Sequence, residues 1–197
     1  MRVGYGNRGK TFELLLEYAN QRYKHTGEAL IEKQHTHFVP LRDRTGKIVN
    51  CKVEEKATVD YVGRYGGRPI AFEAKDCAGD KIDLKRVEPH QRDYLNRWTE
   101  DQAAIGFVIV SFNLSNFYLI PWAYWEAALV ARLNRTTKTV SFEPSYIPWQ
   151  LTGKAAVGMA ELPEAWKIKT GRAVALDYLA TVKQIWEPPQ KLTERDI

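Results

Sequence analysis

The sequence predicts an α/β fold in which helices flank a central mixed sheet. Residues 106–112 (GFVIVSF) form a continuous apolar run, which is typical of a central strand buried on both faces. Apolar residues recur at helical spacing in 11–24 and 173–186. Two β-prone runs, 58–62 and 69–74, flank a glycine-rich turn and predict paired strands. At 197 residues the chain fits one compact domain, 1–197.

The remaining elements follow from local signals. Gly27 is a plausible end for the first helix, and Pro89 suits the first position of a helix that we expect to run to about residue 103. Pro121 opens another predicted helix. We further expect a strand at 29–31, a strand at 116–120, an edge strand at 138–142 and irregular chain at 144–163.

The bulk composition indicates a globular protein that favours polyanionic partners. Hydrophobic residues make up 44% and charged residues 27%, and no run of eighteen apolar residues predicts a membrane span. The net charge is +5, and basic side chains gain affinity for nucleic acid by releasing counterions. Cys51 and Cys77 are the only cysteines and match no zinc pattern, so we expect reduced thiols and a cytoplasmic location, with no secretory signal.

A polar, basic stretch, QHTHFVPLRDRTGKIVNCKVEEK, separates the first predicted strand from the next pair. Its turn signal at 43–46 lies between β-prone residues. The stretch therefore predicts a protruding hairpin or stalk.

Asp60, Glu73 and Lys75 are the candidate catalytic residues. Side chains alternate along a strand, so Glu73 and Lys75 point to the same face. If the two strands pair through the tight turn at 66–67, Asp60 lies alongside Glu73. Two carboxylates beside an ammonium group suit Mg²⁺, which takes its other ligands from water and substrate phosphate. The lysine would orient or deprotonate the attacking water.

This Asp-x(n)-Glu-x-Lys arrangement resembles the PD-(D/E)xK nucleases, although Val59 stands where those enzymes usually have proline. Many of them carry a metal-site glutamate on the first helix, and here Glu13 or Glu17 would serve. Taken alone, the triplet is also typical of a solvent-exposed strand with cross-strand salt bridges. An ordinary solvated helix face would likewise explain Glu13.

The segments NRGKTFE, TVDYVGRYGGRPIAFEAK, EPHQRDYL and GFVIVSF occur in that order between residues 6 and 122 and resemble the RecU Holliday-junction resolvases. The resemblance implies a restriction-endonuclease-like fold and a Mg²⁺-dependent homodimer, with Mn²⁺ as a substitute ion, that resolves four-way DNA junctions in recombination and repair. It implies that Asp60, Glu73 and Lys75 form the site, with Thr58 and Gln91 beside the metal.

The same resemblance implies a stalk at about 36–57 that enters the junction centre. Its basic residues, and those near the N-terminus, are then expected to bind phosphates: Arg8, Lys10, Arg42, Arg44, Lys47 and Lys52. The segments that carry the resemblance do not extend beyond about residue 133. A recombinase is the further partner that the family resemblance implies. The alternatives are another PD-(D/E)xK nuclease that cuts duplex DNA and a non-cleaving, junction-binding architectural protein.

Overall fold

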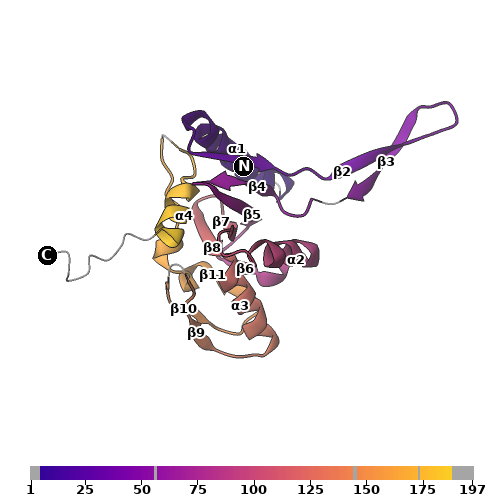
Figure 1. Cartoon of the computed structure of the whole chain (residues 1–197). Coiled ribbons are helices and arrows are strands. Elements are labelled where there is room, and N and C mark those ends of the chain that lie inside the picture. Colours follow the sequence, from indigo (N-terminus) through magenta and orange to yellow (C-terminus); the bar gives the residue numbers. More distant parts are fainter. Residues whose placement is uncertain (1–4, 56, 144–145, 173, 188–197) are drawn as a thin grey trace.

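The computed structural model describes residues 5–55, 57–143, 146–172 and 174–187 (Figure 1). Its centre is a five-stranded sheet in the order β1-β4-β5-β7-β8. The strands β5 and β7 run parallel, and the other neighbouring pairs are antiparallel. The predicted central mixed sheet is therefore confirmed. Its strands are β1 (Ala29–Lys33), β4 (Tyr61–Tyr65), β5 (Arg68–Cys77), β7 (Ile105–Phe112) and β8 (Asn116–Pro121).

Helices cover both faces of this sheet: α1 (Tyr5–Thr26), α2 (Pro89–Trp98), α3 (Trp122–Leu133) and α4 (Tyr178–Trp186). Phe72 of β5 packs on Tyr178 of α4, which in turn meets Tyr23 of α1, so α1 and α4 share one face. On the other face, Gly106 of β7 has the side chains of α2 and α3 directly above it. All eight residues of β7 are buried, as the apolar run predicts. No helix in the described ranges is long and apolar enough to cross a membrane.

Several predicted boundaries are wrong, and hydrogen bonds explain two of them. The helix α2 ends at Trp98 rather than near residue 103, because the Thr99 hydroxyl closes the last turn by donating to the carbonyl of Leu95. The last helix begins at Tyr178 rather than residue 173, since the Asp177 side chain accepts from Ala180 N and caps it. The strand expected at 58–62 starts only at Tyr61.

The segment after α3 is more regular than the sequence predicts. The expected edge strand is β9 (Lys138–Val140), and it pairs with β10 (Trp149–Leu151) outside the central sheet. A second small sheet joins β6 (Lys81–Asp83) to β11 (Ala156–Gly158). Three short 3₁₀ turns complete the described elements: η1 (Leu84–Arg86), η2 (Met159–Glu161) and η3 (Glu164–Trp166).

The expected stalk is a two-stranded hairpin of β2 (His37–Arg42) and β3 (Ile48–Glu55). It projects away from the helices and the central sheet (Figure 1). The Asp43 carboxylate accepts from the backbone N of Thr45 and of Lys47, which fixes the turn at the tip. The side chains from residue 40 to residue 53 are all exposed, so the hairpin presents its basic residues directly to solvent.

Candidate active site

The tight turn between β4 and β5 places Asp60 beside Glu73. Gly66 and Gly67 both have positive φ, 55° and 79°, as the two central residues of a type I′ hairpin turn require. The turn fixes the register at Tyr61 opposite Phe72, so the residue before Tyr61 meets the residue after Phe72. Asp60 N donates to Glu73 Oε2 at 3.2 Å. In return, Asp60 Oδ2 accepts from Ala74 N at 2.9 Å.

Glu73 and Lys75 share one face of β5, as the strand alternation predicts. Lys75 Nζ lies 2.5 Å from Glu73 Oε1. The same carboxylate oxygen accepts from Gln91 Nε2 of α2 at 2.7 Å. Gln91 Oε1 lies 3.5 Å from Lys75 Nζ. The three side chains therefore form one connected polar group between β5 and α2.

Burial dominates the electrostatics of Glu73, whose side chain is only 1% exposed. Loss of water on burial and the negative charge of Asp60 together raise the pKa of its carboxyl to about 8, although Lys75 acts in the opposite direction. When both carboxylates are ionised, the single ammonium group of Lys75 leaves one negative charge unbalanced. A bound divalent cation would offset that charge.

The donor set fits a hard cation that needs few protein ligands. Among the residues that the structure describes, no three Asp, Glu, His or Cys side chains gather as a metal-binding group. Mg²⁺ is commonly bound by one or two carboxylates, with waters and substrate phosphate completing its octahedron. Asp60 and Glu73 supply that minimum.

Two further side chains lie beside these residues. Thr58 is exposed, two residues before Asp60, and its side chain lies close enough to the Tyr94 hydroxyl of α2 to affect the pKa of that hydroxyl. Gln91 also caps α2, because its Oε1 accepts from Glu88 N at 2.8 Å. The sequence analysis does not predict Tyr94 at the site. The one sequence feature that could have identified it is its position one helical turn after Gln91.

The two glutamates proposed on the first helix are both engaged by a single lysine. Lys33 Nζ, at the end of β1, lies 2.9 Å from Glu13 Oε2 and 2.7 Å from Glu17 Oε1. This shared ion pair does not choose between them. The metal-binding role of Glu13 stays a prediction.

The residues expected to bind phosphate fall into two groups. Lys10 on α1 and the hairpin residues Arg42, Arg44, Lys47 and Lys52 are all exposed. Arg8 differs, because its side chain is only 16% exposed and its guanidinium pairs with Asp76. The structure therefore places Arg8 in an internal ion pair.

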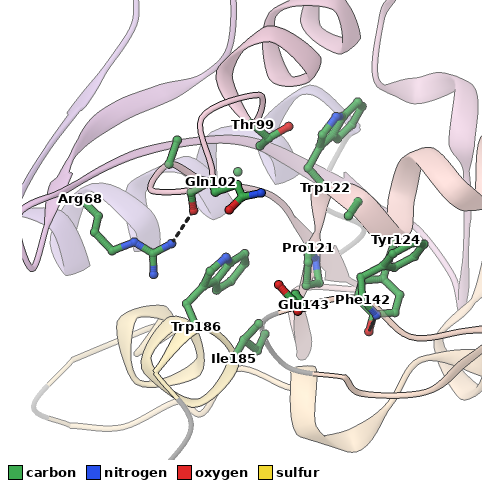
Figure 2. Close-up of a pocket in the computed structure, with 13 residues that line it drawn as sticks. Arg68, Thr99, Gln102, Pro121, Trp122, Tyr124, Phe142, Glu143, Ile185 and Trp186 are labelled. Carbon is green, nitrogen blue, oxygen red and sulfur yellow. Dashed lines mark hydrogen bonds between the residues drawn. The ribbon is translucent and has the colours of Figure 1, made fainter.

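A separate cavity of about 430 Å³ lies near the start of β5, away from Lys75. Figure 2 shows Trp186 and Ile185 of α4 on one side and Tyr124 and Phe142 on the other. Arg68, at the rim, donates to the carbonyl of Ala103. None of the predicted site residues lines this cavity.

The family model and the relatives of known sequence name the same family. The family model RecU, recombination protein U, matches residues 7–184. A protein named Holliday junction resolvase RecU from Streptococcus gordonii is 35% identical over 130 residues, which cover 62% of this chain and 64% of that protein. The chain thus spans slightly less than two thirds of that relative's length. A protein of the same name from Bacillus pumilus is 29% identical over 191 residues, covering 92% of this chain and 82% of that one.

Among solved structures, the Holliday junction resolvase Hjc of Archaeoglobus fulgidus aligns with a TM-score of 0.35 and 15% identity, covering 59% of this chain and 74% of Hjc. The family model extends well beyond the four segments that carry the sequence resemblance, and it includes α3 and most of α4. From the span of that match we conclude that the chain belongs to the RecU family.

Proposed function

We propose that the chain is a magnesium-dependent endonuclease that cuts four-way DNA junctions by paired phosphodiester hydrolysis. The observation that carries the proposal is the hydrogen bond between Asp60 and Glu73 beside Lys75. A protein that only bound DNA would gain nothing from two carboxylates at a phosphate, since they repel it unless a cation intervenes. The names of the relatives from Streptococcus gordonii and Bacillus pumilus support the junction as substrate.

In this proposal Asp60 and Glu73 hold the Mg²⁺, for which Mn²⁺ substitutes, and Thr58 and Gln91 lie next to it. The metal would supply a Lewis acid for the phosphate and a water of lowered pKa. Gln91 keeps one Glu73 oxygen oriented through its 2.7 Å hydrogen bond. Lys75, held at 2.5 Å from the same oxygen, orients the attacking water and offsets charge that develops on the phosphate.

The hairpin β2–β3 supports selectivity for a branched substrate. Its exposed Arg42, Arg44, Lys47 and Lys52 would bind phosphates and set the position of the DNA without reading its sequence. A two-stranded hairpin that projects from the body can enter the opening at the centre of a four-way junction, whereas a continuous duplex has no such opening. Two symmetric nicks need two active sites, so we propose a homodimer with twofold symmetry. Each chain would form a single nuclease domain with one active site. We place the protein in the cytoplasm.

The test compares cleavage of a labelled four-way junction with cleavage of a linear duplex of matching sequence, in Mg²⁺ or in EDTA. Wild type, Asp60→Asn and Asp93→Asn are measured in parallel. Asp93 is an exposed carboxylate on α2 and controls for the change in charge. We expect paired, Mg²⁺-dependent nicks in the junction alone, lost in Asp60→Asn but kept in Asp93→Asn, with junction binding intact in all three.

Two other outcomes would replace the proposal. Equal cutting of junction and duplex would indicate a general nuclease of the same type. Tight junction binding without cutting in any divalent ion would indicate an architectural protein.

A further inference from the structure

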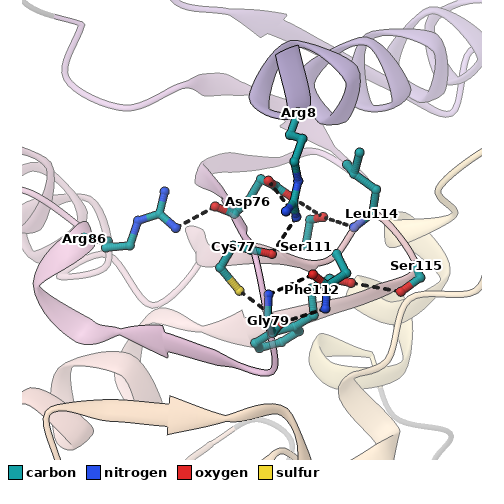
Figure 3. A network of polar contacts seen from close by, with 10 residues as sticks. Arg8, Asp76, Cys77, Gly79, Arg86, Ser111, Phe112, Leu114 and Ser115 are labelled. Atoms are coloured by element: carbon teal, nitrogen blue, oxygen red, sulfur yellow. Dashed lines mark hydrogen bonds and ion pairs between the residues drawn. The ribbon is translucent and has the colours of Figure 1, made fainter. Parts of the chain in front are cut away.

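Asp76, the residue after Lys75, anchors the end of β5 from the opposite face of the sheet. Its Oδ1 accepts from the Ser111 hydroxyl of β7 at 2.7 Å. Its Oδ2 lies 3.3 Å from the guanidinium of Arg8, on the first turns of α1. Figure 3 shows Arg8 reaching from α1 to Asp76, with Ser111 beside it. Lys75 and Asp76 thus point to opposite faces, and the partners of Asp76 hold the strand that carries Lys75.

The backbone at this end of β5 is held as well. Arg8 Nη2 also donates to the carbonyl of Cys77 at 2.9 Å. Asn113 N donates to the same carbonyl at 2.9 Å, from the turn after β7. Arg86 of η1 donates to the carbonyl of Asp76 at 2.6 Å. The two residues after Lys75 are therefore fixed from α1, from β7 and its turn, and from η1.

These interactions differ from a surface ion pair. The side chains of Arg8 and Asp76 are 16% and 10% exposed, and Ser111 is fully buried. Removing one member leaves a largely desolvated charge without its partner, which disturbs the local structure far more than breaking an exposed pair. Arg8 binds two consecutive residues of β5, so its position is defined in two places.

We propose that Arg8, Asp76 and Ser111 are positioning residues for the active site. On the other side of Lys75, Glu73 is held by Asp60 N and Gln91, so Lys75 lies between two fixed points of one strand. Arg8 also fixes the start of α1, the helix that carries Glu13, against the strand that carries Glu73. This inference rests on the proposed nuclease activity. It assigns Arg8 an internal role in place of the phosphate binding that the sequence predicts.

The test separates positioning from DNA binding. Arg8→Ala, Ser111→Ala and Arg8→Lys are compared with wild type and with Arg22→Ala, which removes an exposed arginine from the same helix. Three quantities are measured: the junction Kd in Ca²⁺, the single-turnover cleavage rate in Mg²⁺ at saturating protein, and Mn²⁺ binding without DNA.

We expect Arg8→Ala to lower the single-turnover rate by about tenfold or more, since displacing a reacting group by an ångström costs up to about a hundredfold. Ser111→Ala should lower the rate less, and both variants should bind Mn²⁺ more weakly. The junction Kd should stay at the wild-type value in each. Arg8→Lys should recover much of the rate, because it keeps the charge that Asp76 needs. Arg22→Ala should match wild type throughout.

The opposite results are distinct. Arg8→Ala could instead weaken junction binding and reduce its salt dependence, yet cleave at the wild-type rate when the junction is saturated with protein. That result would show that Arg8 binds phosphate and would overturn the inference. Wild-type rates in both Arg8→Ala and Ser111→Ala would overturn it too. Should Arg8→Ala fail to fold, Ser111→Ala and Arg8→Lys decide. Absence of cleavage by the wild-type protein would instead reject the proposed function.

Discussion

Gln91 connects the first turn of α2 to the carboxylate of Glu73, because its amide donates to Glu73 while its carbonyl caps the helix. The two ends of one side chain thus serve the helix and the active site together. This arrangement ties the place of α2 to the orientation of the buried carboxylate. Stability and activity should accordingly respond together when Gln91 is changed.

Gln91→Ala should lower the free energy of unfolding by about 1–3 kcal/mol, since it leaves buried groups without their hydrogen bonds. It should also slow junction cleavage, because Glu73 loses a donor that orients it. Urea unfolding and single-turnover cleavage measure the two effects. Gln21→Ala, at an exposed position on α1, serves as the control and should change neither.

The free energy of unfolding should depend on pH through Glu73. In the unfolded chain its pKa returns to the ordinary 4.5, whereas burial and Asp60 raise the pKa of the folded state to about 8. Between these pH values the folded protein keeps a proton that the unfolded chain has lost. The contribution of Glu73 to stability is therefore fully present below the lower value and is lost as the pH rises toward about 8.

Urea unfolding at several pH values, in EDTA, tests this dependence. The decline should be smaller in Glu73→Gln, which has no proton to lose, and in Asp60→Asn, which removes the neighbouring charge. It should also be smaller for wild type in Mg²⁺, because a cation stabilises the ionised carboxylates. A decline of equal slope in wild type and Glu73→Gln would contradict the assignment.

The basic side chains of the hairpin should account for much of the salt dependence of junction binding. Replacing Arg42, Arg44, Lys47 and Lys52 by alanine should weaken binding. It should also reduce the slope of log K against log salt by about 0.9 for each phosphate of duplex DNA that the variant no longer neutralises. As a control, four exposed basic residues outside the hairpin are replaced by alanine: Arg22, Lys24, Lys138 and Lys183. The slope of this variant should stay nearer to that of wild type. Equal reductions in both sets would show that only net charge matters.

The choice between Glu13 and Glu17 can be settled by paired substitutions. Both carboxylates share Lys33, so Glu13→Gln and Glu17→Gln make equivalent changes to that ion pair. If Glu13 supports the metal, Glu13→Gln should raise the Mg²⁺ concentration needed for half-maximal cleavage more than Glu17→Gln does. The reverse order would assign the role to Glu17.

The close approach of the β1 and β4 backbones should make the fold sensitive to a single methyl group. An added Cβ at Gly63 would lie 2.1 Å from the carbonyl oxygen of Leu30 and 2.6 Å from Ile31 Cα. Because backbone atoms cannot move aside cheaply, Gly63→Ala should destabilise the protein by about 1–3 kcal/mol or more. Gly9 lies in α1, and an added Cβ there would meet no other atom within 4 Å. Gly9→Ala should therefore stabilise the protein by about 0.5–1 kcal/mol. Thermal unfolding compares the two.

The sequence was most informative where short-range rules determine geometry. Strand alternation was enough to put Glu73 and Lys75 on one face, and the Gly66-Gly67 turn was enough to bring Asp60 alongside. Both rules act over a few residues, so no knowledge of distant pairings was needed to apply them. The apolar run of β7 likewise identified a central strand because only a strand covered on both faces tolerates it.

The sequence was least informative where residues far apart in the chain decide the structure. The start of α4 is held by Tyr23 of α1, whose hydroxyl lies 3.1 Å from the Asp177 carboxylate and 3.2 Å from the Leu176 carbonyl, and no helical periodicity reveals these contacts. Arg8 was expected at DNA because it is basic and near the N-terminus, yet its partner lies 68 residues away at Asp76. Pairings of this kind become visible only when the sheet is assembled.

The hairpin β2–β3 has a consequence for how such proteins diversify. Its strands are held by their own ladder, and its exposed side chains from residue 40 to residue 53 contribute nothing to the interior. Insertions, deletions and charge changes there leave the packing around Glu73 untouched. Under the proposed function, the part that would select the DNA geometry and the part that would hydrolyse it are thus structurally separable within one chain.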